Sequence, residues 1–106
     1  MKLFQFLLPV FDNDRRNNYE KAQRAWQTRA LSIVGGYTIL PNVEGAWCDG
    51  KATYREPMTP VNIACHEEHV PPLLAAFFEL FPDQHAVMVS ELGAATITSR
   101  PAMVAA

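Results

Sequence analysis

The stretch VEGAWCDGKATYR, residues 43–55, carries the clearest folding signal in the chain. Its centre, Asp49-Gly50, is typical of a two-residue type I′ turn, in which glycine adopts a positive φ. A hairpin closed by this turn places Glu44 directly opposite Arg55, a favourable cross-strand charge pair. Strand alternation then predicts one face with Val43, Trp47, Ala52 and Tyr54, and another with Glu44, Cys48, Lys51, Thr53 and Arg55.

Two stretches outside the hairpin have the apolar spacing of amphipathic helices. Asn17 is the expected N-cap of the first, with Glu20 three residues later. Gly35-Gly36 is its expected end, because glycine takes the left-handed C-terminal conformation at little cost. The second helix is expected to begin at Pro71-Pro72 and to end at Pro82. The predicted apolar stripes are Tyr19, Ala22, Trp26, Ala30 and Ile33 in the first helix, and Leu73, Leu74, Phe77, Phe78 and Phe81 in the second.

Short apolar stretches before, between and after these helices predict the remaining strands, at residues 3–11, 37–40, 61–66 and 85–90, with a short added strand at 94–98. The order strand, helix, strand, strand, helix, strand is that of a ferredoxin-like domain. We therefore expect an α+β fold in which two helices cover one face of a four-stranded antiparallel sheet of order 4-1-3-2. The domain is expected to span residues 1–98, and residues 99–106 to form a flexible C-terminal tail.

Composition limits the classes of protein to which the chain can belong. With 106 residues and a net charge of −2, it has room for one domain and lacks the basic footprint of a nucleic-acid binder. The longest uncharged run near the middle, residues 30–43, is interrupted by glycine and proline, so no membrane span is expected. Two cysteines are too few for a disulfide framework. We therefore expect a cytoplasmic protein with reduced thiols.

Several short motifs occur along the chain between residues 5 and 92. They are Pro9-Val10 with Asp12-Asn13-Asp14, then Gly35-Gly36-Tyr37-Thr38, Gly45-Ala46-Trp47, and Asp49-Gly50 followed by Tyr54 and Glu56. This set of motifs resembles a family of small bacterial and phage-type α+β proteins without a known activity. The resemblance covers about residues 5–92, and it implies the same fold class and no particular chemistry.

Alternation in the predicted strands divides their side chains between two faces of the sheet. The set expected to pack on the helices is Phe4, Phe6, Leu8, Val61, Ile63, Cys65, Val87 and Val89. The outward set is Leu3, Gln5, Leu7, Asn62, Ala64, His66, Ala86 and Met88. A solvated face normally carries more charge than this outward set, which therefore indicates either a homodimer seam or the lining of a pocket.

Gln5, Asn62 and His66 are the hydrogen-bonding members of the outward face, and we take them as the candidate binding residues. Only His66 can exchange a proton near neutral pH. His66 also belongs to the sequence Cys65-His66-Glu67-Glu68-His69, which contains residue types that bind metals. The spacing is not that of a zinc-protease motif, and no third ligand is apparent beside His66 and His69. We therefore expect no metal and no cofactor.

These features favour a non-enzymatic binding or protein-interaction module that forms a homodimer through its outward sheet face. The bound partner would be a small molecule or another protein. The alternative is a small dimeric α+β-barrel enzyme, similar in plan to monooxygenases and isomerases. In that case His66 would be the acid–base residue in a cavity over the sheet, oriented by Asn62 or Gln5.

Overall fold

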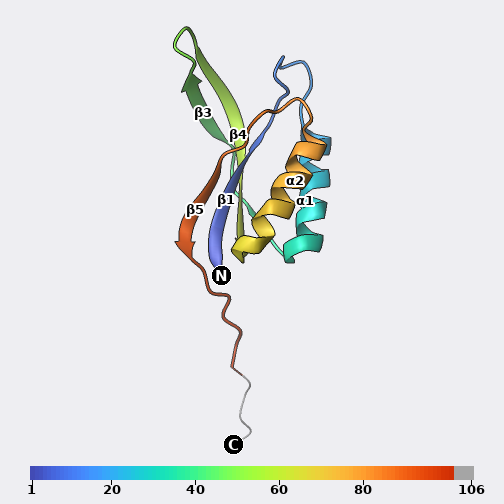
Figure 1. Cartoon of the computed structure of the whole chain (residues 1–106), viewed down its shortest axis with the longest axis vertical. Coiled ribbons are helices and arrows are strands. Elements are labelled where there is room, and N and C mark those ends of the chain that lie inside the picture. The colour runs from blue at the N-terminus through green and yellow to red at the C-terminus, as the bar shows by residue number, and fades with distance from the viewer. Residues whose placement is uncertain (102–106) are drawn as a thin grey trace, which may run out of the picture.

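A computed structural model of the chain describes residues 1–101. Figure 1 shows a sheet with both α-helices against one of its faces. The elements are β1 (Lys2–Pro9), α1 (Glu20–Val34), β2 (Thr38–Ile39), β3 (Val43–Cys48), β4 (Thr53–Cys65), the 3-10 helix η1 (Glu67–His69), α2 (Val70–Leu80) and β5 (Val89–Ala94). Part of the predicted tail, residues 102–106, lies outside the described residues.

The sheet confirms the ferredoxin-like α+β fold and adds a fifth strand. Its strands are antiparallel in the order β2-β4-β1-β5, which is the predicted arrangement of the four basic strands. The predicted hairpin strand and the predicted strand at residues 61–66 are one continuous element, β4, which runs through Pro57 and Pro60. β3 pairs with the first half of β4 and β2 with the second, so the count of four strands was wrong.

The predicted hairpin register was also wrong, by two residues. Cys48 pairs with Thr53, so four residues rather than two connect the strands. The carboxylate of Asp49 causes this: it accepts hydrogen bonds from the backbone N–H groups of Lys51 (2.9 Å) and Ala52 (3.0 Å) and holds a wider loop. Gly50 has the expected positive φ, +91°.

A shift of two residues leaves each side chain on the face that alternation predicted. Trp47 and Tyr54 therefore share a face, and they are now directly opposite each other. Glu44 and Arg55 lie on the other face, as a diagonal ion pair of 3.8 Å between exposed side chains rather than as a directly opposed pair.

The helices lie close to their predicted positions, but the first has a different cap. α1 begins after Tyr19, and no side chain caps it. Asn17 instead donates from its side chain to Asp12 (3.2 Å), inside the loop that precedes the helix. At the other end, Gly35 has a φ of +84° and donates to the carbonyl of Leu31, as the glycine signal predicted.

The core between the sheet and the helices confirms the predicted inward face. The side chains of Phe6, Val61 and Ile63 are fully buried, and Val87 and Val89 pack at the margin. On α1, the ring of Trp26 lies 5.3 Å from that of Phe6, measured between centroids. The whole buried apolar cluster is Phe4, Phe6, Leu8, Trp26, Ala30, Val61, Ile63, Cys65, Leu73, Ala76, Phe77 and Phe81.

The last strand begins later than predicted. Residues 84–87 cross from the helix layer to the sheet (Figure 1), and backbone pairing starts when the Leu7 N–H donates to Met88 (3.1 Å). β5 then continues to Ala94 through an irregularity at Leu92, which has no partner in the β1 register. The separate strand predicted at residues 94–98 is therefore absent: Ala94 ends β5, and 95–98 are not in a strand.

We expect Gly50→Val to destabilise the protein by about 1–2 kcal/mol, because a β-branched residue is strained at positive φ. The matched control is Gly36→Ala, where the backbone has no positive φ and the added methyl meets open space. Urea denaturation measures both. Equal stability of the two variants would contradict the positive-φ turn.

The Asp49 loop should respond to acid. Hydrogen bonds from the N–H groups of Ala52 and Lys51, and then from the Tyr54 hydroxyl, lower the pKa of Asp49 below its ordinary value of 3.8. A lowered folded-state pKa means that the carboxylate stabilises the loop at neutral pH and that this contribution is lost as the pH falls below about 3.8. NMR amide shifts of Lys51 and Ala52 should report this loss, and Asp49→Ala should remove it. An acid transition that persists in Asp49→Ala would exclude this origin.

Candidate interaction surface

The helices do not cover the opposite face of the sheet, and outside the hairpin the side chains on that face are uncharged. We define this open face as the side chains of β1, of β4 outside the hairpin and of residues 88–90 that the strand registers place on one side and that are not fully buried: Leu3, Gln5, Leu7, Met58, Asn62, Ala64, Met88 and Ser90. All but Met88 are partly buried by their neighbours, and Met88 is 63% exposed. The predicted outward residue Ala86 lies before β5 and is exposed. In composition, the open face is closer to a surface buried in a protein interface than to a sheet face in contact with water.

Two of the three candidate binding residues meet at the centre of the open face. Gln5 and Asn62 are directly opposite on β1 and β4, and Gln5 Nε2 donates to Asn62 Oδ1 at 2.9 Å. This bond uses the amide donor of Gln5 and the carbonyl acceptor of Asn62. The Asn62 amide group and the Gln5 carbonyl oxygen therefore remain available to a partner.

The third candidate, His66, lies apart from the amide pair. β4 ends at Cys65, and exposed His66 precedes η1, with its ring 5.8 Å from that of His69. In the described part of the chain, no hydrogen bond joins His66 to Gln5 or Asn62. The arrangement in which an amide orients His66 for proton transfer is therefore not formed.

A hollow of about 370 Å³ opens at one end of the open face. It lies over Leu3, Asn62 and Ala64 and is bounded by residues 34–38 and by Ile97. Its lining has no carboxylate, histidine, lysine or arginine. The hollow can accept an apolar or neutral polar group, but it does not supply the titratable pair that acid–base catalysis needs.

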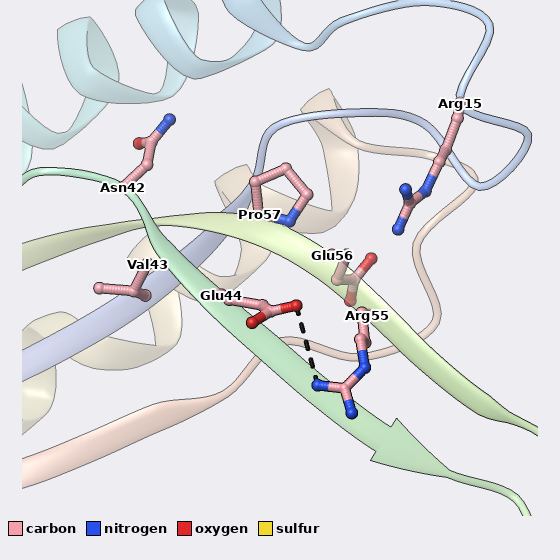
Figure 2. Close-up of a pocket in the computed structure, with 7 residues that line it drawn as sticks. All are labelled: Arg15, Asn42, Val43, Glu44, Arg55, Glu56 and Pro57. Carbon is pink, nitrogen blue, oxygen red and sulfur yellow. Dashed lines mark ion pairs between the residues drawn. The ribbon is translucent and has the colours of Figure 1, made fainter.

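A second hollow of about 370 Å³ lies at the base of the β3–β4 hairpin. Figure 2 shows the Glu44–Arg55 ion pair in it, with Arg15 reaching over from the loop that follows β1. Its charged groups are two arginines and two glutamates, so their formal charges balance. No nucleophile lines it, and all of its side chains except those of Glu56 and Pro57 are exposed.

Charged groups gather instead at the end of the sheet where β1 begins. Lys2 forms ion pairs with Glu67 and, at 2.6 Å, with Glu91. These contacts raise the pKa of Lys2 above its usual range, with Glu67 the larger cause, and Lys2 lowers the pKa of Glu67.

Burial raises the pKa of the Cys65 thiol, which makes it a weaker nucleophile. Within residues 1–101, no group of three or more His, Cys, Asp and Glu side chains is arranged to hold a metal ion.

Sequence analysis missed one conspicuous feature, the aromatic pair on the hairpin arm. We call residues 43–57 of β3 and β4 the arm, which projects past the helices in Figure 1. Trp47 and Tyr54 stack there with centroids 4.4 Å apart, although they are 53% and 43% exposed. Alternation along β4 places them on the same side as Met58 and the open face. The turn signal had placed both on one face, but only the fold shows that nothing in the described chain covers them.

Comparison with known proteins identifies the fold but no family. No family model matches the chain, and no curated protein matches its sequence. Among solved structures, CutA1 from Oryza sativa superposes with a TM-score of 0.69 at 11% identity, covering 92% of this chain and 82% of that one. The divalent cation tolerance protein Cut A1 from Thermus thermophilus gives the same score and identity, with 92% and 86% coverage.

The divalent ion tolerance protein CutA1 from Ehrlichia chaffeensis is a further structural neighbour. Its TM-score is 0.60 at 12% identity, with 91% of this chain and 87% of that chain covered. At such low identity these likenesses establish the α+β fold alone.

No helix in the described residues is both long enough and apolar enough to cross a membrane.

A double-mutant cycle should detect the Gln5–Asn62 bond. We expect Gln5→Ala and Asn62→Ala to be coupled by about 0.5–1.5 kcal/mol, since either change alone removes the same part-buried hydrogen bond. Denaturation of the two single variants and the double variant gives the coupling. Purely additive effects would show that the two amides do not interact.

Proposed function

We propose that this chain is a small, non-enzymatic interaction module whose open face binds a second copy of itself. The observation that carries the proposal is the absence of formal charge across the eight residues of the open face, on the side of the sheet that the helices do not cover. The ion pairs lie elsewhere, at the start of β1 and on the helix side of the arm, and Glu56, which is on the same side of the arm as Trp47 and Tyr54, lies beyond Met58. This distribution fits a surface that is desolvated on association.

The amide pair gives the open face a self-complementary centre. Asn62 retains an unused amide donor and Gln5 an unused carbonyl acceptor. In a twofold homodimer the same patch faces itself, so Asn62 of each copy can donate to Gln5 of the other. Two such bonds would satisfy both amides and fix the register between otherwise apolar surfaces.

The open face also explains why a partner copy fits better than a polar ligand. Leu3, Leu7 and Met58 surround the amide pair, and Met88 lies exposed beside them on the β5 side. Each large apolar side chain removed from water contributes about 1.5–3 kcal/mol when its burial becomes complete. In a contact between two copies, each copy buries its own set of these side chains, so the stabilisation is counted twice.

The test is to place a charge on the open face. We expect Leu7→Lys to weaken self-association by at least about tenfold, because the lysine would be desolvated without a partner. Sedimentation of wild type should give a mass above the 11.9 kDa of one chain, and Leu7→Lys should lower it at equal concentration.

The matched control is Leu31→Lys, the same substitution at an exposed leucine of α1. It should leave the mass unchanged, and circular dichroism should show that both variants are folded. A monomeric wild type, or equal behaviour of the two lysine variants, would refute the proposal.

A further inference from the structure

Part of β4 has an unpaired edge. β1 pairs with β4 only as far as the Pro9–Met58 pair, whereas β4 continues along the arm from Pro57 to Thr53. In the described chain these five residues are paired only with β3, on their other side. The sheet therefore has a step beside the arm, at the place that β1 and β5 occupy farther along β4. Exposed strand edges of this kind readily add another strand.

The chain also presents the strand that could fill this step. β5 is the outermost strand of the sheet, and in the described chain its only partner is β1. β4 and β5 run in the same direction, because each is antiparallel to β1. A second copy, rotated by half a turn in the plane of the sheet, therefore presents its β5 antiparallel to the arm.

We propose that β5 of a second copy pairs with residues Thr53–Pro57 of the arm and extends the sheet from one copy into the next. The step is two strands wide, which is the width of the β1–β5 pair that would enter it. The rotation is reciprocal, so the step of the second copy receives β5 of the first. This contact lies at the edge of the sheet and leaves the open face free for the separate contact proposed above.

Opposite charges and exposed apolar side chains indicate one register for this pairing. Arg55 and Glu91 have half-exposed or more exposed side chains of opposite charge, on the helix side of their strands. Placing Arg55 opposite Glu91 of the second copy also brings Tyr54 opposite Leu92, and these two side chains are 43% and 51% exposed. The same register sets Glu56 beside Ser90. Charge pairs and aromatic contacts across strands are the interactions that stabilise a ladder.

Disulfide cross-linking tests this register directly. Cys48 is exposed and is first replaced by serine, while buried Cys65 is kept. Protein carrying Glu56→Cys is then mixed with protein carrying Ser90→Cys under mild oxidation. Opposed residues on antiparallel strands lie within the distance that a disulfide spans. We expect a covalent dimer in the mixture and none from either protein alone.

The matched control mixes the Ser90→Cys protein with protein carrying Thr28→Cys, which places an exposed thiol on α1. Dimer formation no faster than in this control would overturn the proposal. Because the readout is a bond between the arm and β5, failure of the open-face proposal would leave this result unaffected.

Charge reversal gives a second measurement. Adding Arg55→Glu to the Glu56→Cys protein should slow cross-linking by about two- to fivefold, and adding Glu91→Lys to its partner should restore the rate. Glu44→Gln controls for the ion pair within the arm and should leave the rate unchanged. Slowing by Arg55→Glu without recovery by Glu91→Lys would exclude the proposed register.

Discussion

The continuity of β4 determines most of this structure. From Thr53 to Cys65 it is one strand that supports three others, and every other part of the sheet except β5 pairs with it. Its second half provides Val61 and Ile63 to the core, and its first half extends past the helices as the arm. A strand that is longer than the layer covering it must leave side chains and backbone edges unpartnered. The proposed arm contact lies where β4 extends past the helices, whereas the proposed open-face contact lies behind the part of the sheet that the helices cover.

The sequence was informative wherever a local rule and burial agreed. In β1 and β4, large apolar residues alternate with polar or smaller ones, at Phe4, Phe6, Val61 and Ile63. Because successive side chains of a strand point to opposite faces, only one strand register directs all four toward the helices. Gly35 likewise ends α1, because few other residues take its φ of +84° cheaply. Such signals depend on a few neighbouring residues, so the local structure that they predict is also found in the folded chain.

The expectations that failed depended on competition between similar local arrangements. Asp49-Gly50 suits a two-residue turn, but the Asp49 carboxylate gains two backbone hydrogen bonds by closing a four-residue loop. Asn17 suits a helix cap, but Asp12 engages it inside the preceding loop. For the candidate site, alternation correctly brought Gln5 and Asn62 together, whereas the end of β4 at Cys65 separated His66 from them. Where a strand ends is set by tertiary pairing, which short motifs do not encode.

The two faces of the arm differ in a way that supports association over solvation. On the helix side, Glu44 and Arg55 are charged and well exposed, as expected of a surface in water. On the other side, Trp47 and Tyr54 stack on each other, and Glu56 lies between Tyr54 and the open face. Stacking covers only part of each ring, so about half of the Trp47 side chain still contacts water. An isolated two-stranded ribbon is marginally stable, and an arm that carries such apolar area gains most when a neighbouring copy covers it. The proposed association of the chain would therefore be coupled to the stability of the arm.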